Sequence, residues 1–274
     1  MQMASPRSLF VAICISTLAV DSANAEDDAR PLLRAHAHND YLHNRPLLDA
    51  LQHGFCSVEA DIFLVNGELL VAHTRFEVSP EKTLERLYLK PLRQRIKQNN
   101  GRVYRSGPGF TLLIDIKNNG TETYRALHQM LTRYQDVFSH ADGNQVHQKA
   151  VTAIISGDRP VEVVTAESTR LVGIDGRLTD LNSDLPAHLM PLISDNWRNH
   201  FRWNGQGEFP VQEEARLLDI VKQVHSRNRR IRFWATPDNP AVWNALNEAG
   251  VDLINTDNLP GLRQFLQTAD PQVQ

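Results

Sequence analysis

The stretch from His36 to His73 carries side chains whose types and spacing suit phosphate chemistry. His36 and His38 stand two apart, Glu59 and Asp61 follow with the same spacing, and His73 comes later. Each stands where a short apolar run meets polar residues, as we expect for functional groups at strand ends. Imidazoles, with an ordinary pKa of about 6.5, can accept or donate a proton near neutral pH. Together with the carboxylates, these histidines predict a general acid, a general base and a metal-binding site.

Carboxylates on neighbouring strands predict the metal-binding site. Glu59 and Asp61 lie two apart, so they share one face of a strand. Asp115 and Lys117 emerge two apart from the apolar run 112–116. Oxygen ligands suit Mg²⁺ or Ca²⁺ better than zinc. Two alternatives without a metal stay open at this point. Glu59 and Asp61 could lie on an exposed strand face, and Asp115 and Lys117 could simply form an ion pair.

The rest of the chain alternates short apolar runs with longer amphipathic ones. Strands alternating with helices predict a parallel sheet. Eight such strands in a chain of this length favour an α/β fold in which one domain closes as a (β/α)₈ barrel. Its active site would lie at the carboxyl ends of the strands. The predicted strands are 32–35, 57–63, 110–116, 151–155, 171–174, 189–193, 231–235 and 253–256, and the predicted helices are 46–53, 81–100, 121–134, 212–226 and 240–249.

The first residues have the pattern of a secretory signal peptide. Arg7 precedes an apolar run over 9–20, and Ala23-Asn24-Ala25 offers small residues at a cleavage site. The run is shorter than the roughly 20 residues that span a bilayer, which argues against an anchor. We therefore expect a signal peptide over 1–25, a catalytic domain over 26–274, and a secreted or periplasmic location.

Composition narrows the partners of the chain. Its formal net charge is −3, and such an unbiased surface argues against nucleic acid. Cleavage after Ala25 would leave Cys56 as the one cysteine, so no intrachain disulfide is expected. The sequence after residue 25 contains no long apolar segment, so we expect no integral membrane segment in the mature chain.

These motifs resemble the superfamily of PI-phospholipase C-like phosphodiesterases, which includes the glycerophosphodiester phosphodiesterases. The resemblance rests on a histidine after strand one, E-x-D on strand two, a later histidine and an acid-x-Lys on strand three. It extends to the segments 233–238 and 250–257. The opening H-A-H-N-D-Y is most similar to the branch named for altered inheritance of mitochondria protein 6.

The resemblance implies a role for each matching residue. His38 and His73 would be the acid and base, with His38 preferred to His36 because its distance from Glu59 fits the family spacing better. The reaction would cleave a small-molecule or lipid phosphodiester, with a cyclic phosphate as intermediate or product. The implied ligands of Mg²⁺ or Ca²⁺ are Glu59, Asp61 and Asp115, and the implied substrate-binding residues are His36, Asn39, Lys117 and Trp234.

Departures from the family pattern leave alternatives open. Glycerophosphodiesterases usually follow the first histidine with Arg-Gly, where this chain has Asn39-Asp40, so glycerol-type substrates are in doubt. One alternative is a metal hydrolase of the amidohydrolase or phosphoesterase type, with His36 and His38 as metal ligands. Another is a barrel that binds a phosphorylated headgroup without cleaving it.

Overall fold

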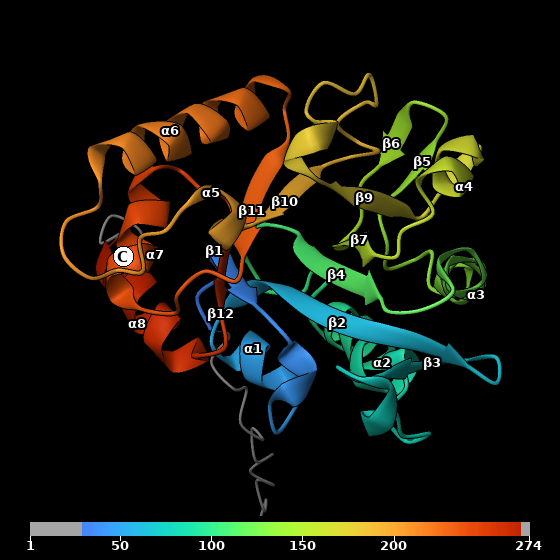
Figure 1. Ribbon diagram of the computed structural model, residues 1–274. Coiled ribbons are helices and arrows are strands. Elements are labelled where there is room, and N and C mark those ends of the chain that lie inside the picture. The colour runs from blue at the N-terminus through green and yellow to red at the C-terminus, as the bar shows by residue number, and fades with distance from the viewer. Residues whose placement is uncertain (1–28, 270–274) are drawn as a thin grey trace, which may run out of the picture.

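Eight parallel strands form the centre of the molecule (Figure 1). The computed structural model describes residues 29–269, so the expected signal peptide lies outside the described residues. The hydrogen-bonded order runs β11-β10-β9-β7-β4-β2-β1-β12. A single parallel bridge between Arg232 and Leu253 then joins β11 to β12. The sheet is a nearly closed barrel, which confirms the predicted fold class.

The barrel strands agree with the predicted strands in number and order. Their bounds are β1 (Leu32–Ala37), β2 (Phe55–Val65), β4 (Phe110–Ile116), β7 (Val151–Gly157), β9 (Val172–Gly176), β10 (Leu192–Asn196), β11 (Arg230–Trp234) and β12 (Ile254–Thr256). Most of their side chains are buried, because a barrel strand faces the interior on one side and helices on the other. β1 runs two residues beyond its predicted end, and His36 therefore lies inside the strand.

Helices surround the barrel, with α6, α7 and α8 on the left of Figure 1 and α3 and α4 on the right. Apolar side chains on one face of each longer helix pack against the strands, as Tyr124, Leu127 and Leu131 do in α3. A π-helical turn, Glu85–Leu89, leads into α2. The helices are α1 (Leu48–Gln52), α2 (Lys90–Gln98), α3 (Gly120–Thr132), α4 (Val161–Ala166), α5 (Trp197–His200), α6 (Val211–Ser226), α7 (Pro240–Glu248) and α8 (Leu259–Ala269).

Short strands also lie outside the barrel. β3 (Glu68–Val71) pairs antiparallel with β2 around a turn at Asn66-Gly67. A second sheet was not predicted; in it β5 (His140–Asp142) pairs with both β6 (Gln145–His147) and β8 (Thr169–Arg170). These strands have two or three residues each and are largely polar, so they show no alternating apolar pattern.

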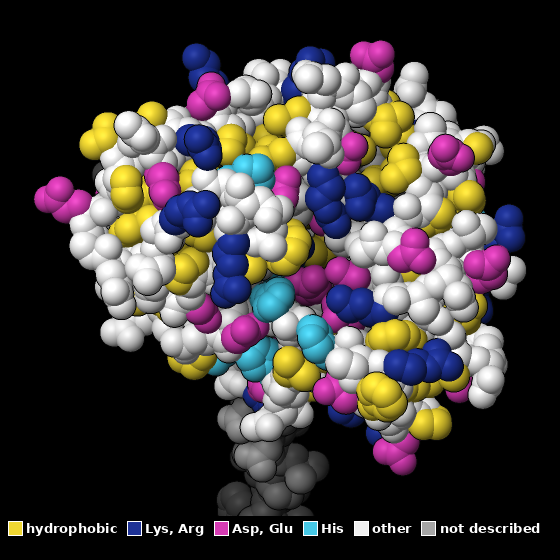
Figure 2. All heavy atoms as spheres, in the orientation of Figure 1, with side chains coloured by type: hydrophobic (Ala, Val, Ile, Leu, Met, Phe, Trp, Pro, Cys, Tyr) yellow, Lys and Arg dark blue, Asp and Glu magenta, His cyan; other side chains and the backbone are white. Residues whose placement is uncertain are grey.

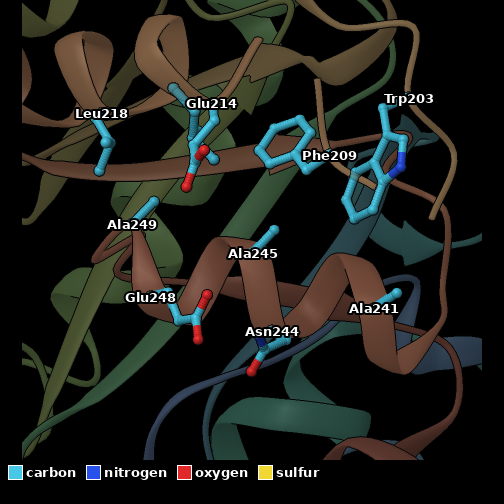
Figure 3. A pocket seen from close by; sticks show the side chains of 10 residues that line it. Trp203, Phe209, Glu214, Leu218, Ala241, Asn244, Ala245, Glu248 and Ala249 are labelled. Atoms are coloured by element: carbon cyan, nitrogen blue, oxygen red, sulfur yellow. The ribbon is translucent and has the colours of Figure 1, made fainter. Parts of the chain in front are cut away.

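Two outer helices leave a groove between them. It has a volume of about 320 Å³ and lies between α6 and α7. Trp203 and Phe209 stack at one end, with ring centroids 4.5 Å apart (Figure 3). Across residues 29–269, no helix is both long and apolar enough to cross a membrane.

Candidate active site

Three carboxylates from adjacent strands meet near the carboxyl ends of β2 and β4. Asp61 and Asp115 are paired in the parallel register, and Glu59 precedes Asp61 on the same face. One oxygen from each carboxylate lies within 4.8 Å of the others, which is close enough to hold a metal ion. Figure 2 shows acidic side chains in a hollow near the centre of this face, with histidines and basic side chains around it.

The electrostatics of this carboxylate cluster favour a bound cation. Burial and the nearby charge of Glu59 raise the pKa of Asp61. Burial also raises the pKa of Asp115 to about 6, with Glu59 and Asp61 adding to the rise and Lys117 opposing it. Asp61 Oδ1 is buried without a hydrogen-bond partner among the described residues. A divalent cation would relieve both the repulsion and the unmet acceptor, and oxygen-only ligands fit Mg²⁺ or Ca²⁺.

Glu59 is paired with an arginine across the barrel interior. Arg232 on β11 donates from Nη1 to Glu59 Oε2 over 2.9 Å, and both side chains are almost fully buried. Burial alone would raise the pKa of Glu59, but Arg232 and His36 outweigh it and hold that pKa below its usual range. Glu59 is therefore a carboxylate anion, suited to ligate a cation from its remaining lone pairs.

His36 lies too deep in the barrel for the predicted substrate contact. Its Nδ1 lies 2.7 Å from Ser57 Oγ, and Arg232 Nη1 lies 2.9 Å from its Nε2. The side chain is fully buried, and burial, aided by Arg232 and opposed by Glu59, lowers the pKa of His36 to about 4. His36 is thus a neutral ring with both nitrogens engaged. This burial does not fit the predicted role of His36 in substrate binding; within the barrel it contacts Glu59 and Arg232 instead.

His38 stands just past the end of β1 and is partly exposed. Its Nδ1 lies 2.9 Å from Asp257 Oδ1, beyond the end of β12. Burial lowers the pKa of His38, but the hydrogen bond to Asp257 and the charge of Glu59 outweigh this, so the pKa is raised. A proton on Nδ1 directed at Asp257 leaves Nε2 free to exchange a proton with a ligand.

His73 follows the β2–β3 hairpin and is half exposed. Its Nδ1 lies 3.0 Å from the Tyr41 hydroxyl and 3.4 Å from Asp61 Oδ2. The same hydroxyl lies 2.7 Å from Asp61 Oδ2 and 2.7 Å from Asn39 Oδ1. Burial and Asp61 raise the pKa of Tyr41, so its hydroxyl stays neutral. Tyr41 and Asp61 fix the Nδ1 side of His73, which leaves Nε2 for proton transfer.

The other predicted site residues lie around this cluster. Lys117 Nζ lies 2.8 Å from Asp61 and 3.3 Å from Asp115; burial lowers its pKa, but these carboxylates outweigh that and raise it. Asn39 has a left-handed backbone (φ 47°), and its Nδ2 lies 3.2 Å from His38 Nδ1. Trp234 is partly exposed at the end of β11. Lys117 thus contacts the carboxylates directly, whereas Asn39 contacts His38 and Tyr41.

Several residues that organise the site were missed in the sequence. Tyr41 and Arg232 received no role, and Asp257 entered only as the last residue of the segment 250–257. The opening H-A-H-N-D-Y contains Tyr41, so this motif could have pointed to it. Arg232 sits inside an apolar strand, where a charged residue signals a buried partner.

Comparison with known proteins places the chain in a family. Residues 24–172, more than half of the chain, match the family described as AIM6-like phosphodiesterase domain, and the chain belongs to that family. Residues 230–260 match the glycerophosphoryl diester phosphodiesterase family. The superfamily and branch that the sequence motifs predicted are therefore confirmed.

Curated relatives and one solved structure agree with this placement. Altered inheritance of mitochondria protein 6 from Eremothecium gossypii is 28% identical, over 87% of this chain and 70% of that protein. A homolog from Arthroderma benhamiae is 29% identical, over 84% of this chain and 82% of its own length. The crystal structure of a glycerophosphodiester phosphodiesterase from Parabacteroides distasonis has a TM-score of 0.54 at 16% identity, covering 90% of this chain and all of that one. This last likeness concerns the fold alone.

Proposed function

We propose that the protein is a metal-dependent phosphodiesterase. Its active site is the strand-end cluster, which consists of Glu59, Asp61 and Asp115 together with His38 and His73. One observation carries the proposal. Three carboxylates that can hold a cation, two buried and one partly buried, lie beside two accessible histidines, and each of these histidines has a carboxylate near its Nδ1. Family membership supports the same class of reaction.

His38 is the general base in this proposal, and Asp257 positions it. The proton on Nδ1 is held by Asp257 Oδ1 at 2.9 Å, so Nε2 accepts the proton of the attacking hydroxyl. Asp257 then stabilises the imidazolium that forms. The hydroxyl oxygen, once deprotonated, attacks phosphorus. If it belongs to the substrate the product is a cyclic phosphate, and if it belongs to water the product is a monoester.

His73 is the general acid, because its Nδ1 side is fixed by Tyr41 and Asp61. Nε2 donates a proton to the departing alkoxide, which leaves as an alcohol. Lys117 can turn from the carboxylates toward a phosphoryl oxygen and offset its charge. Glu59, Asp61 and Asp115 would hold Mg²⁺ or Ca²⁺, which supplies positive charge for the phosphoryl group when bound.

Exposed apolar side chains near the site favour a substrate with an apolar part. Phe76 is fully exposed three residues after His73, and Leu42 is exposed four residues after His38. Trp234 is partly exposed at the end of β11. Exposed apolar side chains beside a polar site can bind the apolar part of a ligand. Of the two substrate classes open from the sequence, we therefore favour a lipid phosphodiester over a small polar one.

The amidohydrolase alternative fits the site less well. It needs both histidines of the H-x-H pair as metal ligands. His36 Nε2 already accepts a hydrogen bond from Arg232, and its Nδ1 is engaged by Ser57.

Residues 1–25 still carry the pattern of a signal peptide, and on that pattern we propose that the chain is exported.

Hydrolysis assays under controlled metal conditions test the proposed function. The purified chain would be stripped with EDTA and given Mg²⁺ or Ca²⁺, with glycerophosphodiesters, lysophospholipids and bis(p-nitrophenyl) phosphate as substrates. We expect turnover only with added cation, loss of it in His38→Ala, and preference for substrates with an acyl chain. A folded protein that binds these diesters equally well in wild type and His38→Ala, without cleaving any, would support the binding barrel instead.

A further inference from the structure

A second cluster of metal-binding side chains lies on the small sheet, away from the carboxylates of the candidate active site. It contains His140 and Asp142 on β5 and His147 on β6. β6 ends four residues before β7 begins, and β8 ends two residues before β9 begins. The small sheet therefore lies at the amino-terminal ends of the barrel strands, whereas the candidate active site lies at their carboxyl ends.

The hairpin geometry puts the three side chains on one face. His140 and His147 are directly opposite each other in the antiparallel register. Asp142 is two residues after His140, so it points to the same side. The two imidazole rings stack with centroids 4.7 Å apart and 16° between their planes.

The ligand atoms converge on one carboxylate oxygen. Asp142 Oδ2 lies 3.3 Å from His147 Nε2 and 4.0 Å from His140 Nε2. Metal–ligand bonds of about 2.0–2.2 Å at tetrahedral angles put zinc ligands about 3.3 Å apart. The Asp142–His147 separation equals that value and the Asp142–His140 separation is longer, so a small rotation of His140 would complete a site. All three side chains are partly exposed, so an ion and a water molecule can reach them.

A hydrogen bond from a neighbouring strand orients the carboxylate. Thr169 on β8 is paired with Asp142 and donates from Oγ1 to Asp142 Oδ1 over 2.7 Å. This contact leaves Oδ2 directed at the histidines, as outer partners do for metal ligands. Arg170 alternates to the opposite face of β8, where it donates to Gly143 O and lies 3.2 Å from His188 Nε2.

The remaining nitrogen of His140 needs an acceptor when Nε2 holds a metal. Nδ1 of His140 is buried and has no hydrogen-bond partner within residues 29–269. A cavity of about 180 Å³ adjoins it, lined by Ser139, Thr152 and His188 among others. That volume has room for water, which can accept the Nδ1 proton.

We propose that His140, Asp142 and His147 form a zinc-binding site that fastens the β5–β6 hairpin and, through Thr169, β8. Two imidazoles and one carboxylate suit zinc, whereas Mg²⁺ and Ca²⁺ prefer oxygen ligands alone. Water supplies the fourth ligand. The site is independent of the proposed phosphodiesterase chemistry.

Zinc stoichiometry and affinity test this site directly. The metal-stripped full chain would be dialysed against buffered Zn²⁺, with excess Mg²⁺ to occupy the carboxylate cluster, and zinc per chain measured by atomic emission. Wild type should bind one equivalent. His140→Ala and His147→Ala should each weaken that affinity by more than about 100-fold, since removing a ligand costs more than the 10- to 100-fold of an outer partner.

Two further variants distinguish an organised zinc site from a chance group of side chains. Thr169→Val removes only the hydroxyl that orients Asp142 and should weaken zinc binding by about 10- to 100-fold. His225→Ala removes a histidine whose Nε2 contacts Asp252 at 2.8 Å and that lies outside the cluster, so it should leave binding unchanged. The proposal is overturned if wild type binds no zinc, or if folded His147→Ala and Thr169→Val both bind it as wild type does.

Discussion

Asp257 helps to raise the pKa of His38 against the effect of burial, so it should affect how the proposed activity depends on pH. The charged groups that act on His38 are Asp257 and Glu59, which raise its pKa, and Arg232, which lowers it. A general base works only when it is deprotonated, so a raised pKa places the acidic limb of the rate profile at higher pH.

Asp257→Asn should therefore move that limb to lower pH. The amide removes the negative charge that favours the imidazolium, so the pKa of His38 falls. The neutral amide also holds Nδ1–H less firmly than the carboxylate and does not stabilise the imidazolium, so kcat should drop by about 10²- to 10⁴-fold. The measurement is kcat/KM against pH. Asp252→Asn, at the His225–Asp252 pair elsewhere, is the control, and an unmoved limb in Asp257→Asn would contradict the role of Asp257.

Glycine at the end of β7 makes room for a proposed metal ligand. A Cβ at Gly157 would lie 2.2 Å from Asp115 Oδ1 and 2.4 Å from Ile116 O, and its backbone φ is +71°. Neither contact is tolerable, so a side chain here must displace Asp115. The sequence alone hid this role, because the neighbour that requires glycine comes from a different strand.

Gly157→Ala should weaken cation binding at the carboxylate cluster and destabilise the fold. The left-handed backbone alone costs about 1–2 kcal/mol for a residue with a Cβ, and displacement of Asp115 adds to it. Calorimetric titration with Mg²⁺ or Ca²⁺ and urea unfolding would measure both effects. Gly67→Ala has a similar φ of +82° but meets no atom within 4 Å, so it should lose stability alone. Equal cation affinity in both variants would be inconsistent with this account.

The turn after β1 contains a buried acid that links two elements. Asp40 Oδ2 accepts hydrogen bonds from Leu47 N at 2.5 Å and from the Tyr88 hydroxyl at 2.9 Å. Burial raises the pKa of Asp40 to about 7 from 3.8. The folded state thus favours the protonated acid. Its stabilising contribution is complete below about pH 4 and is lost as the pH rises through about 7.

Asp40→Asn should remove this pH dependence, because the amide stays neutral and keeps an acceptor oxygen. Urea unfolding of both proteins in EDTA, between pH 4 and pH 8, would give their free energies of unfolding. Relative to the variant, wild type should lose on the order of a few kcal/mol across that range. Parallel curves would show that Asp40 is not the group responsible.

At the scale of the whole molecule, Arg232 links strands across the barrel interior. It donates to Glu59 on β2 and His36 on β1, and its Nε donates to Ser194 on β10 over 3.1 Å. Asp175 on β9 lies 3.9 Å from its Nη2. The buried guanidinium of Arg232 therefore has polar partners on four other strands.

Arg232→Met should destabilise the barrel by about 3–5 kcal/mol in EDTA, because Glu59 would stay buried without its partner. Added Mg²⁺ or Ca²⁺ should restore part of that loss by offsetting the charge of Glu59. Denaturant unfolding with and without cation would measure both. Arg34→Met, which removes contacts to the neutral side chain and carbonyl of Asn247, should cost less, and an equal cost would refute the charge argument.

The succession of strands along the chain could be predicted from the sequence, whereas side-chain contacts between strands far apart in the sequence could not. Apolar runs and turn residues define each β–α unit locally, so the eight barrel strands and the ends bearing Asp61 and Asp115 followed from the chain itself. His36 and His38 are the same residue type and lie two apart, yet one is buried and the other accessible. That difference depends on where β1 ends and on Arg232, which comes from β11.

The central claim is that the strand-end cluster cleaves phosphodiesters with His73 as the acid, and leaving-group dependence tests it most directly. We would measure kcat of wild type and His73→Ala, with saturating Mg²⁺ or Ca²⁺, on a diester that releases an alkyl alcohol and on one that releases p-nitrophenolate. An alkoxide needs the proton and p-nitrophenolate does not, so the variant should lose about 10²- to 10⁴-fold with the alcohol and far less with p-nitrophenolate. Equal losses on both substrates, or no turnover by wild type with either cation, would contradict the account.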